Sequence, residues 1–398
     1  MPATDLPFSA TEYARRLEKV RAAMASRGLD VLFIEDPSNM AWLTGYDGWS
    51  FYVHQGVLIF HDRDPMWWGR GQDAQGAIRT VWMADENCVG YPDNFVQSTE
   101  RHAMQHLARI ITDLGFGTAQ IGVELDNYYF SAKAYLSLVE SLPDARFRDA
   151  TALVNWQRTV KSDEELVFMR RAARISEAIV DGILERAEPG LAKNLLVADI
   201  FKTAVSGLDV DGETIWGDYA AIVPLLPSGS DAAASHLTWD GRPLKSGEAT
   251  FFEISGCYRR YHAPLCRTIY FGTPPDFMTR AADALVEGLN GALQAARAGN
   301  RASDVAHAIA TALEKAGIER SARAGYPVGL SYPPDWGERT ISIREEDDTV
   351  LEAGMTFHLM PGLWMGDWGL EITESILIRD GAPAECLCDR PRKLFVKP

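Results

Sequence analysis

A helix-start signal near the middle of the 398-residue chain constrains the fold more than any other feature. Ser162-Asp163-Glu164-Glu165 has the pattern of a capping box, in which the serine caps a helix and the last glutamate reaches back to the cap. The apolar face of the helix behind it comprises Leu166, Met169, Ala173, Ile179 and Ile183. A long amphipathic helix here is typical of the start of a second domain, so we expect domains at residues 1–160 and 161–398.

The first 160 residues alternate between helical and extended patterns. Apolar spacing predicts helices at about 11–27 and 100–114. Short apolar runs predict strands at residues 31–34, 57–60, 66–68 and 121–123. Strands that alternate with helices indicate an α/β domain with its own core.

The second half groups its helices and strands in blocks. Helices are predicted at about 194–206, 277–298 and 303–316. Strands are predicted at residues 220–226, 249–255, 268–271, 355–359 and 371–377. This order indicates an α+β domain in which helices pack on one face of a mostly antiparallel sheet.

Composition restricts the partners and the compartment. Lys and Arg number 39 against 55 Asp and Glu, and the net charge of −16 argues against binding to a nucleic-acid backbone. Five cysteines, without the spacing of a disulfide framework, indicate a reducing compartment. Neither a secretory leader nor an apolar run of about 18 residues is apparent, so we expect a cytoplasmic protein that does not span a membrane.

One stretch combines a histidine with an acid. His236 follows small residues in a loop, and Glu253 lies in an apolar run of strand character after a polar turn. A hairpin that brings the two together would make an acid–base site. A solvated loop histidine and a structural glutamate would give the same pattern, so both interpretations stay open from this stretch alone.

Other motifs are absent or ambiguous. The sequence has no Walker-type glycine loop, GxSxG elbow or paired CxxC. His102 and His106 lie four residues apart on a predicted helix, but the glutamate of HExxH is missing and the helix is polar, which favours an exposed face over a zinc site. The aromatic run YDGWSFY at residues 46–52 suits core packing and a ligand-pocket wall equally.

Segments along nearly the whole chain resemble motifs of the creatinase/aminopeptidase P/prolidase superfamily, in that superfamily's order. In the second half they are KSDEELVFMRRAARISEAI, SGSDAAASH, RPLKSGEATFFEISG, CRT, AGYPVGL, LEAGMTFHLMPGLW and GLEITESILI. In the first half, the GW of residues 46–52 and WGRGQDAQG resemble creatinase. The resemblance implies a creatinase-like, ribonuclease H-like α/β N-terminal domain followed by an α+β pita-bread catalytic domain.

The resemblance also implies where the metal ligands of the family would fall. Its metallopeptidases hold two divalent metals with two aspartates, one histidine and two glutamates. The matching positions in this chain are Glu253, Pro264, Tyr326, Met360 and Glu374. Proline and methionine cannot replace carboxylates around a hard cation, and tyrosine is a poor substitute for imidazole. We therefore expect a site without metal or other cofactor, and not a metal-dependent Xaa-Pro peptidase.

Among metal-free members, the chain resembles the ectoine hydrolases more than creatinase, which has a glutamate where Cys266 stands. This likeness implies a hydrolase that opens the cyclic amidine of ectoine, or of hydroxyectoine, to N-acetyl-L-2,4-diaminobutyrate. In this hypothesis Glu253 attacks the ring or activates water, Glu374 holds the amidinium, and His236 moves the proton. The residues expected to line the substrate pocket are Tyr326, Met360, Trp364, Trp49 and Tyr52.

The resemblance further implies a homodimer and an association with a downstream deacetylase. The main alternative is a creatinase-like amidinohydrolase that acts on another small zwitterion. Two less favoured alternatives are a metal-dependent Xaa-Pro peptidase and a non-catalytic protein that uses the old peptidase cleft for binding. The sequence distinguishes neither ectoine from hydroxyectoine nor attack by Glu253 from attack by water, and it leaves open which ring C–N bond breaks.

Overall fold

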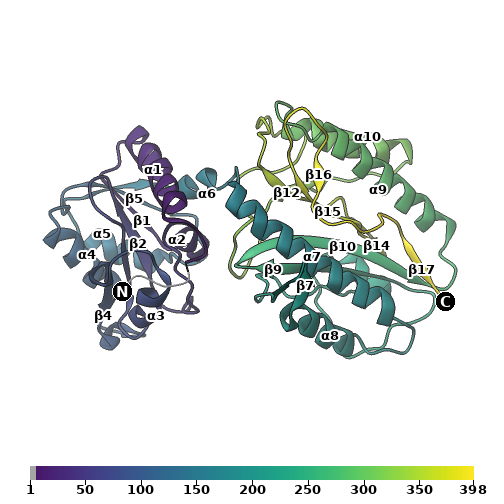
Figure 1. Cartoon of the computed structure of the whole chain (residues 1–398), viewed down its shortest axis with the longest axis horizontal. Helices are drawn as coiled ribbons and strands as arrows, with labels where there is room; N and C mark the ends of the chain where they lie inside the picture. Colours follow the sequence, from purple (N-terminus) through teal and green to yellow (C-terminus); the bar gives the residue numbers. More distant parts are fainter. Residues whose placement is uncertain (1–5) are drawn as a thin grey trace. The chain divides into compact units, whose positions relative to one another are not determined.

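Residues 6–398 of the chain are described by a computed structural model, which is shown in Figure 1. The chain divides into two compact units, Met1–Gln157 and Arg158–Pro398. Each unit buries a hydrophobic core of its own.

The first unit is built on a six-stranded sheet with the order β4-β3-β2-β1-β5-β6. Its strands are β1 (Val31–Ile34), β2 (Gly56–Phe60), β3 (Met66–Arg70), β4 (Cys88–Tyr91), β5 (Gln120–Val123) and β6 (Arg146–Asp149). Its α-helices are α1 (Ala10–Ser26), α2 (Pro37–Thr44), α3 (Ala74–Thr80), α4 (Ala103–Asp113), α5 (Ala132–Ser141) and α6 (Leu153–Gln157). The central strand β1 pairs parallel with β5 and antiparallel with β2, and α4 and α5 bury their apolar residues against the sheet.

The second unit has two main sheets, with the orders β17-β10-β9 and β11-β12-β15-β16. The strands of these sheets are β9 (Ala249–Tyr258), β10 (Tyr261–Phe271), β11 (Gly325–Pro327), β12 (Thr356–Leu359), β15 (Glu374–Leu377), β16 (Glu385–Cys386) and β17 (Phe395–Lys397). Three short elements also matter below: the 3-10 helix η3 (Gly229–Ala233) and the paired strands β13 (Leu363–Met365) and β14 (Trp368–Leu370). A further small pair is β7 (Leu208–Val210) with β8 (Glu213–Ile215).

Four helices surround these sheets: α7 (Asp163–Arg186), α8 (Lys193–Ser206), α9 (Asp276–Ala295) and α10 (Ala302–Lys315). Helix α7 packs on the β9–β10 hairpin, whereas α9 and α10 pack on each other and share a core with β12 and β15 (Figure 1). The predicted α+β organisation is thus observed, but the helices divide into two groups rather than covering one face.

The predicted capping box is confirmed at the start of α7. The Ser162 hydroxyl accepts the backbone N–H of Glu165, and the Glu165 carboxylate accepts the backbone N–H of Ser162. The helix then approaches β9 very closely, because Gly256 has no side chain: a Cβ there would lie 2.2 Å from the carbonyl oxygen of Ala172. The Ser176 hydroxyl accepts the Gly256 N–H at 2.7 Å. Helix α7 is therefore fixed directly to β9, the strand that carries Glu253.

Some sequence predictions are wrong. Residues 220–226 form no strand, although Leu225 makes an isolated bridge to Glu253. His102 and His106 are half-buried rather than exposed, since His102 accepts the backbone N–H of Met104 at the start of α4 and His106 accepts the indole N–H of Trp68. The fold uses both histidines in local hydrogen bonds that a surface face would not make.

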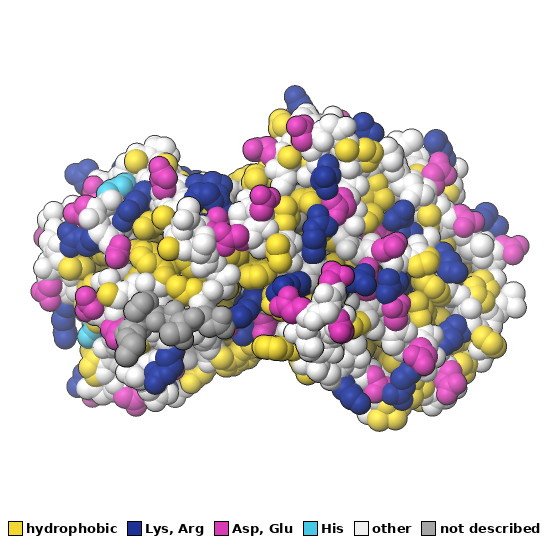
Figure 2. Space-filling view, viewed as in Figure 1, with side chains coloured by type: hydrophobic (Ala, Val, Ile, Leu, Met, Phe, Trp, Pro, Cys, Tyr) yellow, Lys and Arg dark blue, Asp and Glu magenta, His cyan; other side chains and the backbone are white. Residues whose placement is uncertain are grey.

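The surface is mixed in charge. Figure 2 shows acidic and basic side chains interspersed over the visible face. Many of them form exposed ion pairs, such as Arg171 with Glu213 at 2.5 Å. Within residues 6–398, no helix has both the length and the apolar character needed to cross a membrane.

Candidate active site

Glu253 lies in the middle of β9, a strand that is buried over nine of its ten residues. Its Cα pairs with that of Cys266 on β10, and its side chain is only 6% exposed. Burial, followed by the negative charges of Glu371 and Asp335, raises the pKa of Glu253 well above its usual value. The hairpin therefore holds a carboxyl group in the interior of the unit beside other acids.

Glu371 lies directly after β14, and of these acids it raises the pKa of Glu253 most. The Thr268 hydroxyl accepts its backbone N–H and donates to its backbone carbonyl, at 2.9 and 2.8 Å. The Glu371 side chain is 1% exposed, and burial raises its pKa to about 7. The thiol of Cys266, a weak donor, lies against this carboxyl group. Neither carboxylate oxygen has a hydrogen-bond partner of ordinary geometry among residues 6–398.

A chain of neutral polar groups lies beside the two acids. Thr373 Oγ1 accepts the backbone N–H of Cys266 and lies 2.8 Å from His358 Nε2. His358 Nδ1 lies 3.0 Å from the Tyr326 hydroxyl, which also accepts the indole N–H of Trp336 at 2.7 Å. Burial lowers the pKa of His358 to about 3, so the imidazole is neutral even though Glu253 Oε1 is 3.8 Å from its Nδ1.

Glu374 occupies different surroundings. Its Oε1 lies 2.7 Å from Arg267 Nη2, and both side chains are fully buried. Arg267 also donates to the carbonyl oxygens of Thr373 and Pro391. Thr373 immediately precedes β15, and Glu374 is the first residue of that strand. Thr373 contacts His358, whereas Glu374 contacts Arg267.

The remaining predicted site residues are distributed as follows. His236 is exposed on the loop after η3, with its Nδ1 3.4 Å from the Ser235 hydroxyl. Trp364 packs against the cluster formed by Ala232, Phe251 and Cys266, and its buried indole N–H has no hydrogen-bond partner within the described residues. The Met360 N–H donates to the carbonyl oxygen of Ala324, the residue before β11.

Trp49 and Tyr52 belong to the first unit, where they are 60% and 67% exposed. Tyr46, from the same aromatic run, is buried and donates its hydroxyl hydrogen to Gln55 at 2.7 Å. The first aromatic residue of the run thus packs in the core, whereas a ligand-contacting role for Trp49 and Tyr52 stays a prediction.

The family's two metals do not fit the donor set of this chain. The positions that correspond to metal ligands include the side chains of Pro264 and Met360, and Tyr326 already accepts from Trp336. Both ring nitrogens of His358 are engaged by Tyr326 and Thr373. Within residues 6–398, no three His, Cys, Asp or Glu side chains are grouped so that they could hold a metal ion. The side chains at these positions therefore do not suit the family's two divalent metals.

Sequence reasoning missed three residues of this site: Glu371, Thr373 and His358. The side-chain alternation of the predicted strand 371–377 was a usable signal. It places Glu371 and Thr373 on one side of that strand and Glu374 on the other. His358 lies alone in the apolar run TFHLM and gave no comparable signal.

The fold and the site define a class of protein. Residues 167–380 match the family model of metallopeptidase family M24, and residues 16–160 match that of the creatinase/prolidase N-terminal domain. The chain belongs to metallopeptidase family M24, and the predicted creatinase-like and pita-bread fold classes are confirmed.

Two relatives match it over nearly its full length. The chain is 56% identical over 395 residues to an ectoine hydrolase of Halomonas elongata, which covers 98% of this chain and 99% of the relative. It is 39% identical over 393 residues to an uncharacterised hydrolase/peptidase of Sinorhizobium fredii, with 98% and 99% coverage.

Solved structures share the fold at low identity. A prolidase from Thermococcus sibiricus superimposes with a TM-score of 0.81 at 17% identity, covering 98% of this chain and 100% of that one. An Xaa-Pro dipeptidase from Bacillus anthracis gives 0.79 at 19% identity, covering 96% and 99%. At these identities the likeness concerns the fold.

Proposed function

We propose that this chain is a hydrolase that opens the cyclic amidine ring of ectoine to N-acetyl-L-2,4-diaminobutyrate. The observation that carries the proposal is the buried pair of acids, Glu253 and Glu371, with no fixed cation bonded to Glu371 in the described part of the chain. A planar amidinium is a cation that a carboxylate can bind through two parallel hydrogen bonds. The 56% identity to an ectoine hydrolase supports the same substrate.

Glu253 is the group that starts the reaction. The pKa of Glu253 is raised by burial and by the negative charges of Glu371 and Asp335, so Glu253 favours the protonated form while no cation lies beside it. A cationic ring that enters beside Glu253 and Glu371 lowers both pKa values, and the substrate thereby generates the carboxylate that reacts with it. Glu253 then attacks the amidine carbon or removes a proton from the water that does so.

Opening the ring requires one C–N bond to break and the departing nitrogen to gain a proton. Water supplies the oxygen of the new acetamide group and two hydrogens in total, so the products balance without a further reactant. We assign proton transfer to His236, because it is exposed and can exchange protons with solvent. The hydroxyl of Tyr326 and the side chains of Met360 and Trp364 would form the wall of the pocket.

Several finer features belong to the same proposal. The reaction is metal-independent, in keeping with the donor set described above. The protein works as a cytoplasmic homodimer, in which Trp49 and Tyr52 contact the substrate, and it delivers its product to a deacetylase. The five cysteines form no disulfide within residues 6–398, which is compatible with a reducing compartment.

Product identification tests the function. Purified protein incubated with ectoine should yield a product heavier by one water, identified by NMR as N-acetyl-L-2,4-diaminobutyrate. Hydroxyectoine, creatine and an Xaa-Pro dipeptide serve as competing substrates. Activity should survive a chelator, and metal analysis should find far less than one metal ion per chain. Turnover of creatine or of the dipeptide but not ectoine, or chelator-sensitive turnover, would contradict the proposal.

His236 has a separate test. His236→Asn should lower kcat by about 10²–10⁴-fold, the usual contribution of a general acid or base, with little change in thermal stability because the side chain is exposed. Exposed His307, which is on α10, provides the matched control as His307→Asn. A kcat equal to that of the unsubstituted protein would remove His236 from the mechanism.

A further inference from the structure

Glu371 is a buried acid that the fold leaves unsatisfied. Its side chain is 1% exposed, and apart from the weak thiol donor of Cys266 neither carboxylate oxygen has a hydrogen-bond partner within residues 6–398. Buried polar groups in folded proteins nearly always have partners, and an exception calls for an explanation. A ligand that supplies the missing donors is such an explanation.

Two other buried acids of the same unit form ion pairs with buried basic side chains. Glu374 lies 2.7 Å from Arg267, and Glu338 lies 2.7 Å from Lys161. Each of these pairs joins segments that are distant in sequence, which is a structural role. Because Oε1 of Glu374 already pairs with Arg267, Glu374 is a weaker candidate than Glu371 for binding a second cation, although its Oε2 has no hydrogen-bond partner within residues 6–398.

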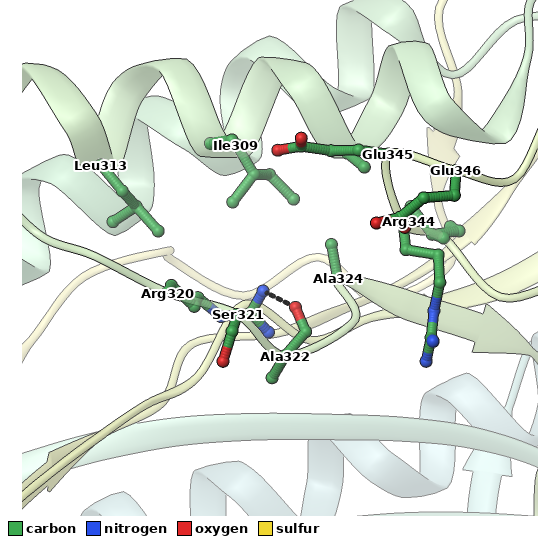
Figure 3. Close-up of a pocket in the computed structure, with 12 residues that line it drawn as sticks. Ile309, Leu313, Arg320, Ser321, Ala322, Ala324, Arg344, Glu345 and Glu346 are labelled. Carbon is green, nitrogen blue, oxygen red and sulfur yellow. Dashed lines mark hydrogen bonds between the residues drawn. The ribbon is translucent and has the colours of Figure 1, made fainter.

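Arg320 is the basic residue whose charge lowers the pKa of Glu371, but its guanidinium forms hydrogen bonds with other groups. Its guanidinium donates to the carbonyl oxygens of Gly362, Ala322, Arg323 and Met360. Figure 3 shows its hydrogen bond to Ala322 at the floor of a separate pocket beneath α10, which has a volume of about 230 Å³. Burial lowers the pKa of Arg320 to about 10, so it remains charged at neutral pH without reaching Glu371 by an ion pair among the described residues.

An unsatisfied donor belongs to the same part of the unit. The Trp364 side chain packs against the cluster formed by Ala232, Phe251 and Cys266, and its buried indole N–H lacks a partner among the described residues. The carboxyl group of Glu371 also lies against the thiol of Cys266. The Glu371 carboxyl group, which needs donors, and the Trp364 N–H, which needs an acceptor, therefore lie beside the same cluster. A small zwitterion carries both complementary groups.

We propose that Glu371, rather than Glu374, is the residue that selects the cationic amidinium of the substrate, with the Trp364 N–H binding its ring carboxylate. This assignment rests on the proposed function and names the side chains that recognise each charge. Glu371 accepts two parallel N–H bonds from the amidinium, which leaves the amidine carbon exposed to Glu253. Glu374 becomes a positioning residue that holds Arg267.

Binding of ectoine at varied pH tests this assignment. In a Glu253→Gln background, which suppresses turnover, calorimetry should show ectoine affinity rising as the pH rises through about 7, where Glu371 loses its proton. Adding Glu371→Gln should weaken binding by about 100-fold at pH of about 8, the scale of two charge-assisted hydrogen bonds, and should abolish the pH dependence. Adding Glu374→Gln instead should change the affinity by less than about tenfold and keep the pH dependence.

Further variants keep the test decisive. Glu371→Asp retains the charge on a shorter side chain, so binding should weaken by about tenfold while the pH dependence stays, even if Glu371→Gln folds poorly. Trp364→Phe should weaken ectoine binding while keeping the ring packing. If Glu371→Gln binds ectoine as tightly as its parent, with the same pH profile, Glu371 does not select the cation, although the proposed hydrolysis can stand. If the unsubstituted protein neither binds nor hydrolyses ectoine, the proposed function and this assignment fall together.

Discussion

Two buried glutamates, one in each unit, show how differently the chain treats a carboxyl group. Glu124 follows β5 in the first unit and is 4% exposed. It accepts the backbone N–H groups of Glu35 and Asp36 at 3.1 Å, and the side-chain amides of Asn39 and Asn127 at 2.6 and 3.0 Å. Glu371 in the second unit is equally buried but has no comparable partner within residues 6–398.

Burial raises the pKa of both carboxyl groups to about 7, so burial alone does not separate them. The difference lies in the supply of donors. Strands β1 and β5 are parallel neighbours, so the residues after them meet at one edge of the sheet, and their N–H groups and side chains surround Glu124. The described chain satisfies this buried acid fully and leaves Glu371 in need of donors. We attribute this contrast to a difference in role: Glu124 is a structural acid, whereas Glu371 is proposed to bind a ligand.

The largest expected effect separates chemistry from structure. Glu253→Gln should lower kcat for ectoine by about 10⁴-fold or more, since the neutral amide can neither attack nor remove a proton. Glu124→Gln, its counterpart in the first unit, should leave kcat unchanged once the protein is folded. Steady-state kinetics and circular dichroism of both variants provide the measurement. A strong loss of kcat in folded Glu124→Gln would break the comparison.

The next largest effect is on stability and concerns the buried ion pair of Glu374 with Arg267. Glu374→Gln leaves Arg267 charged and unpaired in the interior, so the free energy of unfolding should fall by about 3–5 kcal/mol. Replacing both partners, with Arg267→Met added, should recover part of that loss because no uncompensated charge remains. Denaturant unfolding measures both. Unchanged stability in Glu374→Gln would show that the pair is not the structural link assigned here.

The smallest effect is the pH dependence of stability due to Glu371. Its pKa is raised to about 7 from an ordinary value of about 4.3, so between these values the folded protein holds a proton that the unfolded chain has lost. The stability from this group is fully present below pH of about 4.3 and is lost as pH rises through about 7, up to about 3 kcal/mol. Glu371→Gln should abolish this loss. Denaturant unfolding at pH of about 5 and about 8 compares the two proteins, and parallel changes in both would refute the assignment.

Much of the fold could be predicted because it rests on local signals. The capping box at Ser162 and the period of about 3.6 behind it specify α7 without any long-range contact. Helix α2 was missed because all eight of its residues are buried, which removes the amphipathic period; Asp36 and Pro37 at its start were the remaining signal. The segment 220–226 has the composition of a strand, yet only Leu225 pairs with Glu253.

The site could be predicted only in part. Glu253 was found because its segment resembles a motif and its acid stands out in an apolar strand. Matching by motif also selected Glu374, since it considers the type of residue and ignores the side of the strand to which a side chain projects. Glu371, Thr373 and His358 come together only through the pairing of β12 with β15 and the hydrogen bonds of Cys266 and Thr268, which are long-range contacts that no local pattern contains.

The contacts of Arg267 have a consequence for how the protein is made. Its guanidinium donates to the carbonyl oxygens of Arg390 and Pro391, and its strand β10 pairs with β17 just beyond them. During synthesis these partners emerge more than a hundred residues after Arg267 itself. The charged side chain of Arg267 therefore lacks these partners while residues 268–389 are translated. The second unit completes its three-stranded sheet only after residues 390–397 have left the ribosome.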